Sequence, residues 1–104
     1  MDNFKIIYKI LRLLEEAMDD DYFDRSMLSA EYFGVSENRL NAILKMLQDE
    51  GYVKGVIYVK GLAGVKLERN FGITLKGLEY LEENSTMKKA AALLKGIKET
   101  VPGL

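Results

Sequence analysis

The sequence predicts a mainly α-helical domain that carries one small β-hairpin. Three observations support this prediction. Apolar residues recur at helical spacing over most of the chain. Residues 52–74 alternate instead with a period of two around the stretch GLAG. The segment FGITLKGLEYLEEN, residues 71–84, changes from strand-like to helix-like residues without a loop. A chain of 104 residues is long enough to bury one core, so we expect a single domain spanning 1–104.

The composition excludes several classes of function. The chain contains no Cys and no His, which rules out disulfides, thiolate or imidazole metal sites, and Ser–His–Asp or Cys–His catalysis. No spacing of the remaining reactive side chains suggests an active site, so we expect no enzyme, no cofactor and no metal. Charges interrupt the apolar N-terminal stretch, and no run reaches ~18 apolar residues, which predicts a cytoplasmic protein without a membrane segment.

The charge is unevenly distributed along the chain, although the net charge is only −1. Residues 1–35 carry four basic and eight acidic side chains, whereas residues 36–78 carry seven basic and four acidic side chains. A near-neutral chain is not a strong sequence-independent binder of polyanions. The basic middle section leaves room for binding of a polyanion on one face.

The first helix is expected to be apolar on two adjacent faces. One face consists of Phe4, Ile7, Tyr8, Leu11, Leu14 and Met18, and the second of Ile6, Ile10, Leu13 and Ala17. Such a helix either lies central in a helical core or uses its second face to meet another subunit. The acidic run DDDYFD at 19–24 should end this helix, because clustered Asp favours loops.

Residues 26–53 have the pattern of a helix-turn-helix. Ser26 is placed to cap a short helix through about Phe33, and Gly34 permits the positive φ of a tight turn. Ser36 can cap a longer helix over 37–50, which Gly51 would close. The apolar stripe of that helix is Leu40, Ile43, Leu44 and Leu47. Ordinary helical proteins contain the same αα-hairpin, so this pattern alone does not establish DNA binding.

A two-stranded wing is expected over 52–74. The segment YVKGVIYVKG is rich in strand-forming residues, and GLAG at 61–64 is a suitable hairpin tip. Four apolar residues then alternate with polar ones, with one interruption at Arg69, and give the second strand one buried face: Val65, Leu67, Phe71 and Ile73. The wing should therefore follow the second helix of the helix-turn-helix directly.

The second wing strand must return to the helical core. Thr74 can end the strand and cap the next helix in one step. We expect Leu75, Leu78 and Leu81 to dock that helix, and Gly77 to mark a close backbone approach. Asn84 and Ser85 indicate a break, after which a last helix is expected over 86–101.

This order of elements resembles the winged helix-turn-helix proteins, as do the phrases SENRL at 36–40, LQDEGYV at 47–53 and ITLKGLEYL at 73–81. Over its whole length the chain resembles the YjcQ family, small bacterial proteins often found among prophage genes. The resemblance implies a winged helix-turn-helix fold, α-α-α-β-β-α plus a C-terminal helix. Phrases like LQDEGYV and ITLKGLEYL recur in winged-helix regulators, which favours a bacterial or prophage DNA-binding protein that regulates transcription.

The residues expected to contact double-stranded DNA lie on three elements. They are Ser36, Asn38, Arg39, Asn41, Ala42 and Lys45 on the recognition helix 37–50, Ser29 and Tyr32 on the preceding helix, and Lys60, Lys66 and Arg69 on the wing. Asn can read adenine, Arg or Lys can read guanine, and Ala can touch a thymine methyl group. Two alternatives stay open. The helix face is simply solvated, or the wing lysines only prevent aggregation through the strand edge.

We therefore expect a DNA-binding regulator that acts by occupying a site. Few positive charges on one monomer predict weak binding, and a homodimer formed through the first and last helices would double the footprint. The alternative is a winged-helix module for protein–protein interaction that does not bind DNA.

Overall fold

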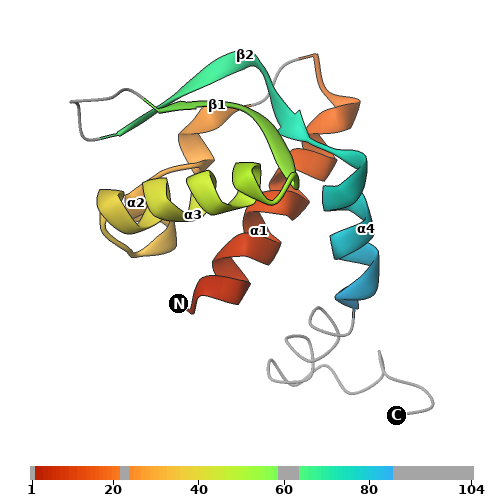
Figure 1. Ribbon diagram of the computed structural model, residues 1–104, viewed down its shortest axis with the longest axis horizontal. Helices are drawn as coiled ribbons and strands as arrows, with labels where there is room; N and C mark the ends of the chain where they lie inside the picture. The colour runs from red at the N-terminus through yellow and green to blue at the C-terminus, as the bar shows by residue number, and fades with distance from the viewer. Residues whose placement is uncertain (1, 22–23, 59–63, 86–104) are drawn as a thin grey trace.

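One antiparallel hairpin lies across a group of helices (Figure 1). The computed structural model describes residues 2–21, 24–58 and 64–85. The helices and strands of this part are α1 (Asn3–Glu16), α2 (Ala30–Phe33), α3 (Glu37–Asp49), β1 (Val53–Tyr58), β2 (Val65–Ile73) and α4 (Leu75–Glu83). The mainly helical architecture with a two-stranded hairpin is the one expected. The expected last helix, 86–101, and residues 61–63 of the expected hairpin tip, 61–64, lie outside the described residues.

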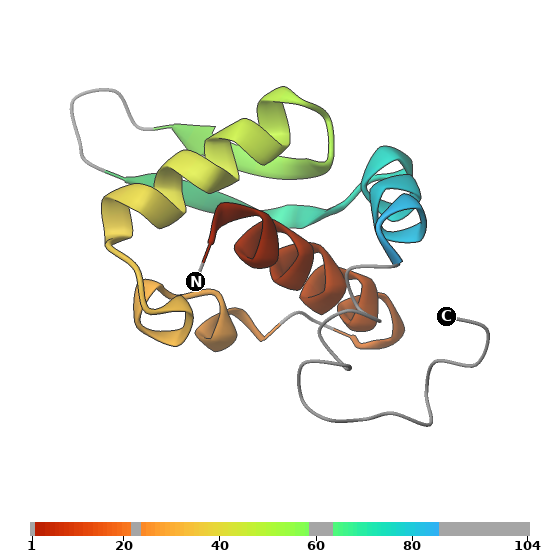
Figure 2. The same cartoon turned by 90° about the horizontal axis from the view of Figure 1, so that it is seen from below.

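Helix α1 lies at the centre of the helical group, between α4 on one side and α2 and α3 on the other (Figures 1 and 2). Its buried residues are Ile6, Ile10, Leu11 and Leu14, which come from both expected faces. Phe4 and Met18 were expected on the first face, but they are 64% and 62% exposed. The chain tightens into a 3₁₀ turn at Ala17–Asp19, so Met18 leaves the helical face before it reaches the core.

The expected cap at Ser26 is wrong. The Asp24 side chain accepts a hydrogen bond from the Ser26 N–H and opens a 3₁₀ turn at Arg25–Met27. Helix α2 starts later, where the Ser29 side chain accepts from the Tyr32 N–H at 3.1 Å. Asp24 competes with Ser26 for the first orphan N–H groups, because Asp is at least as good an N-cap as Ser.

Helix α3 has the boundaries that its sequence predicts. Ser36 accepts from the Arg39 N–H at 3.1 Å, and all four residues of the predicted stripe are buried. At the other end Gly51 has φ +81°, and the N–H groups of Gly51 and Tyr52 bond to the carbonyls of Gln48 and Leu47. This is a Schellman ending, which satisfies two carbonyls of the last turn.

A large bulge divides the hairpin. Val53 pairs with Ile73 and Lys54 with Gly72, but Val56 pairs with Leu67, so residues 68–71 of β2 face Gly55 alone. Gly55 has φ +86°, and a Cβ there would lie 2.6 Å from the Phe71 Cα. Only glycine fits this position, because the positive φ and the close approach both exclude a side chain.

Strand β2 runs into α4 without a loop, as predicted. Thr74 caps α4 through the Gly77 N–H, and a Cβ on Gly77 would collide with the Tyr52 carbonyl oxygen. The expected docking role of Leu75 is wrong, since this side chain is 74% exposed. The first turn instead turns Gly77 towards the core, and Leu81 fills the buried position one turn later. Within the described residues, no helix has the length and apolarity needed to cross a bilayer.

Candidate nucleic-acid interface

Helix α3 has two sides of different composition. The inner side buries Leu40, Ile43, Leu44 and Leu47, each at most 5% exposed. The outer side carries exposed residues at helical spacing: Asn38, Ala42, Lys45 and Asp49. Among the described residues, Tyr58 of β1 approaches this outer line at Lys45, and all four outer residues stay exposed. The sequence predicted both sides, because the apolar stripe fixes which residues must point away from the core.

Strand β1 of the hairpin is hydrogen-bonded along α3 and runs in the opposite direction to it. The Gln48 side-chain amide donates to the Val56 carbonyl and accepts from the Val56 N–H, both at 2.6 Å. One turn earlier on α3, the Lys45 carbonyl accepts from the Tyr58 hydroxyl at 3.1 Å. Gln48 thus satisfies the free edge of β1 as a third strand would. We call α3, β1 and β2 the α3–hairpin unit.

The predicted residues of α3 lie on three lines along the helix. Asn38, Ala42 and Lys45 occupy the exposed outer line. Arg39 lies on the flank near α1, where its Nε donates to Asn3 Oδ1 at 2.8 Å. Asn41 is half-buried on the flank near the hairpin, since a Cβ on Gly64 would lie 3.8 Å from its Nδ2. The structure therefore brings the outer line together and directs Arg39 and Asn41 to either side of it.

The two predicted residues of α2 make local contacts. Ser29 is half-buried and serves as the α2 N-cap, although its hydroxyl retains a hydrogen to donate. The Tyr32 ring contacts Phe33 edge-on, with centroids 5.1 Å apart, and lies under the Lys9 Nζ of α1 at 5.1 Å. The described contacts of Tyr32 are therefore with α1 and its own helix, not with α3.

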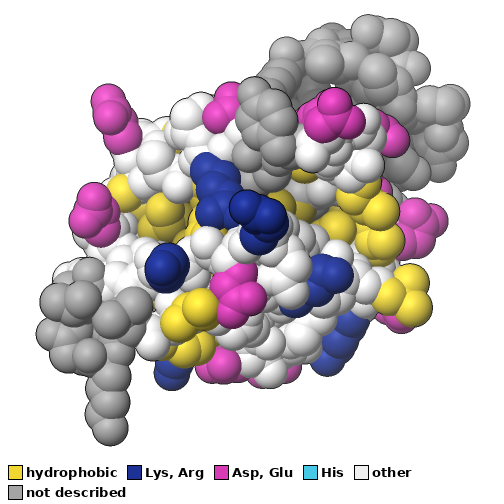
Figure 3. Space-filling view, turned by 90° about the horizontal axis from the view of Figure 1, so that it is seen from above, with side chains coloured by type: hydrophobic (Ala, Val, Ile, Leu, Met, Phe, Trp, Pro, Cys, Tyr) yellow, Lys and Arg dark blue, Asp and Glu magenta, His cyan; other side chains and the backbone are white. Residues whose placement is uncertain are grey.

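The predicted wing residues separate into two groups. Lys66 is exposed opposite Ile57, close to the tip end of the hairpin. Arg69 is exposed within the bulge, at the other end, where it lines a cleft beside α1. Lys60 lies outside the described residues. In Figure 3 Lys and Arg side chains gather over the hairpin, among fewer acidic ones. The described cations of the hairpin are Lys54, Lys66 and Arg69.

The electrostatics of the outer line centre on Lys45. Its Nζ lies 4.0 Å from Asp49 Oδ2 and 5.5 Å from the centroid of the Tyr58 ring. Both charged side chains are more than half exposed, so this ion pair contributes at most ~1 kcal/mol. Partial burial, with a smaller contribution from the Asp49 carboxylate, raises the pKa of the Tyr58 hydroxyl above its usual value. Tyr58 therefore stays a hydrogen-bond donor at neutral pH.

Sequence reasoning missed Gln48 and Tyr58, which position the hairpin. Gln48 belongs to a helical pattern and Tyr58 to a strand pattern. Neither pattern predicts which backbone group of a neighbouring element the polar side chain will bond. It also missed Arg25, whose two Nη atoms donate to the carbonyls of Leu67 at 3.0 Å and Glu68 at 2.6 Å. Arg25 is 42 residues from Leu67 along the chain, and periodicity does not predict contacts at this separation.

Comparison with known proteins places the chain in a family. Residues 8–100 match the family described as YjcQ protein. The chain belongs to the YjcQ family. It is 32% identical over 102 residues to "Uncharacterized protein YjcQ" of Bacillus subtilis (strain 168), and the alignment covers 97% of this chain and 99% of that protein. No solved structure gives a significant match. The family resemblance expected from the sequence is thus confirmed along nearly the whole chain.

Proposed function

We propose that this YjcQ-family protein is a winged-helix protein that binds duplex DNA and regulates transcription. Helix α3 would enter the major groove with its outer line, and the hairpin would contact the flanking backbone. The observation that carries the proposal is the exposed outer line of α3 beside a hairpin held rigidly along the same helix. A helix of 13 residues is roughly 20 Å long, and the major groove is wide enough to admit it.

The chemistry of the outer line suits base-edge contacts. The Asn38 amide offers both a donor and an acceptor, as adenine recognition requires. Ala42 presents a methyl group, and Lys45 presents an ammonium group whose ion pair with Asp49 is weak. Lys66 is exposed on the hairpin opposite Ile57, where a backbone phosphate would neutralise it.

Selection of bound oligonucleotides from a random duplex pool tests this proposal. DNA recognition predicts enrichment of one short half-site, and affinity for it should fall with salt at a logarithmic slope of roughly −3 if three phosphates are neutralised. A pool that does not enrich at low salt would overturn the proposal. Substitution of Lys45 by Ala should weaken binding to the enriched site.

A protein-interaction role is the second candidate, and one observation favours it. The exposed side of α3 also carries Glu37 and Asp49, which phosphates would repel. An interaction module predicts that neither salt nor the Lys45 substitution changes affinity for DNA, because no specific DNA complex forms. The selection experiment therefore separates the two functions.

A homodimer would strengthen DNA binding by pairing two half-sites. Phe4 and Met18, both strongly exposed at opposite ends of α1, support an apolar contact between copies. Light scattering at high micromolar concentration tests this part of the proposal. A mass twice that of the 11.8 kDa monomer is expected, and a monomeric mass would contradict it.

A further inference from the structure

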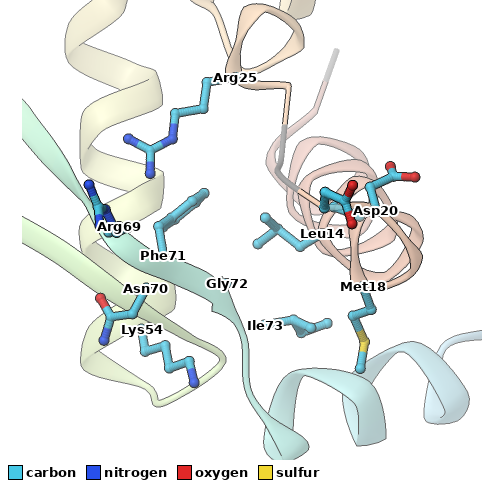
Figure 4. A pocket seen from close by; sticks show the side chains of 12 residues that line it. Leu14, Met18, Asp20, Arg25, Lys54, Arg69, Asn70, Phe71, Gly72 and Ile73 are labelled. Atoms are coloured by element: carbon cyan, nitrogen blue, oxygen red, sulfur yellow. The ribbon is translucent and has the colours of Figure 1, made fainter.

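A cleft lies between the end of α1 and the bulged strand β2, apart from the outer line of α3 (Figure 4). Its volume is about 520 Å³, which is within the usual range for a small-molecule site. Leu14, Phe71 and Ile73 give it an apolar floor. Figure 4 shows Arg69, Asn70 and Lys54 on the hairpin side of this floor and Asp20 and Met18 on the α1 side.

The shape of the cleft depends on the bulge. Because residues 68–71 of β2 face Gly55 alone, the strand bends there and carries Arg69 out of the regular alternation. Arg25 holds the bulge in place, since its two Nη atoms donate to consecutive carbonyls of β2, those of Leu67 and Glu68. The cleft is therefore built from fixed contacts on the hairpin side.

The positive and negative side chains of the cleft lie on different parts of its lining. Arg25, Lys54 and Arg69 line one part of it, and Asp20 and Asp21 line the other. Over the residues that the structure describes, the side chains of Lys54 and Arg69 have neither an ion pair nor a hydrogen bond. Both are exposed at the edge of an apolar floor. Three cations against two carboxylates give the cleft a positive balance, concentrated beside Phe71 and Ile73.

We propose that this cleft binds a small organic anion with an apolar body. The apolar body covers Leu14, Phe71 and Ile73, and the anionic group lies on the hairpin side, where Lys54 and Arg69 provide the positive charge. A carboxylate is a suitable group, because guanidinium and ammonium donors both form charge-assisted hydrogen bonds with it. Asp20 and Asp21 oppose the anion and limit its affinity, so their neutralisation strengthens binding. This inference goes beyond the DNA-binding proposal and does not depend on it.

Titration of the full chain with 2-naphthoate, followed through its amide NMR spectrum, tests the site. We expect saturable shifts at Phe71, Gly72 and Ile73. The neutral isostere 2-naphthamide tests the need for charge, and inorganic phosphate tests the need for an apolar body. The amide should bind about threefold more weakly, because an exposed ion pair changes affinity by up to roughly fivefold. Phosphate should also bind at least about threefold more weakly, because it buries none of the apolar floor. Equal binding of 2-naphthoate and 2-naphthamide, or the absence of saturable shifts, would overturn the proposal.

Variants locate the anionic group. Lys54→Met and Arg69→Met should each weaken 2-naphthoate binding by about threefold, and Asp20→Asn should strengthen it by about twofold. Lys66→Met is the matched control, because Lys66 is an exposed hairpin lysine outside the cleft. Binding that responds equally to Lys54→Met and Lys66→Met would show a general charge effect and would contradict the site. The titration contains no DNA, so its failure leaves the DNA-binding proposal unaffected, and the converse also holds.

Discussion

The inner and outer sides of the α3–hairpin unit differ in how tightly each residue is constrained. On the inner side, Leu44, Val56 and Phe71 are at most 7% exposed, and Gly55 has no room for a Cβ. On the outer side, Asn38, Ala42 and Lys45 are exposed, and the one ion pair among the described residues of this face is long and solvated. Stability therefore depends on the inner side, which leaves the composition of the outer side free for recognition.

This difference predicts that stability and binding can be changed separately. A substitution on the inner side should lower the free energy of unfolding, and any loss of binding should follow from unfolding. A substitution on the outer side should leave that free energy nearly unchanged and affect only binding. The predictions below test this separation, starting with the largest expected effect.

Gly55→Ala should lower the free energy of unfolding by about 3 kcal/mol or more, because Ala is strained at φ +86° and its Cβ would collide with the Phe71 backbone. Gly72→Ala is the matched control. It pairs with Lys54 in the same hairpin, and its Cβ would have no heavy atom closer than 3.7 Å. Urea denaturation of both variants measures the difference, and equal midpoints would show that the bulge does not constrain the hairpin.

Gln48→Ala should cost about 2 kcal/mol, because the Val56 N–H and carbonyl each lose their 2.6 Å partner in a half-buried position. Gln48→Glu keeps the acceptor but places a carboxylate oxygen against the Val56 carbonyl, so it should cost at least as much as Gln48→Ala. Asp49→Ala, one residue further on the exposed side, should change stability by less than ~0.5 kcal/mol. Thermal unfolding of the three variants gives the order, and a Gln48→Ala protein as stable as Asp49→Ala would contradict the account.

Lys45→Ala should change the free energy of unfolding by less than ~0.5 kcal/mol, because both partners of its ion pair are more than half exposed. Its affinity for duplex DNA should fall several-fold, and the magnitude of the salt slope should fall by about 1 if Lys45 neutralises one phosphate. Lys76→Ala, at the start of α4, is the control and should leave the slope unchanged. Fluorescence anisotropy over a range of salt concentrations measures both quantities.

Tyr58 should give the smallest effect on stability, and the size of this effect depends on pH. Because its pKa is raised in the folded state, the hydroxyl contributes stability in full below its ordinary pKa of 10.0, and this contribution is lost as pH rises through the folded-state value. Tyr58→Phe should therefore cost about 0.5 kcal/mol at pH 8 and less at strongly alkaline pH. Urea denaturation at the two pH values tests this, and a cost that grows with pH would contradict it.

Regular elements were predictable from the sequence because apolar periodicity shows which side chains are buried and local cap residues show where a helix begins and ends. The stripe of α3, the caps at Ser36 and Thr74, and the Gly51 ending follow from local pattern and are all found. Local patterns predicted less well where two acceptable residues compete. Asp24 opens the turn in place of Ser26, and Gly77 takes the inward position that Leu75 was expected to share.

Long-range contacts were not predictable. The alternation of β2 is interrupted at Arg69, inside the bulge, but this interruption does not show that residues 68–71 face Gly55 alone, because a bulge depends on the partner strand. For the same reason, the sequence placed Lys66 and Arg69 together on one wing, whereas the bulge separates them into the tip end and the cleft. The helices and strands could thus be predicted from periodicity. The positions of the charged residues on the surface could not, because they depend on how β1 pairs with β2.

The most direct test of the central claim is an amide NMR map of the protein during titration with a short DNA duplex at low salt. The account predicts that the largest shifts fall on Asn38, Ala42 and Lys45 of the outer side and on Lys66 of the hairpin. Shifts confined to α1 and α4, or a spectrum that the duplex leaves unchanged, would contradict it.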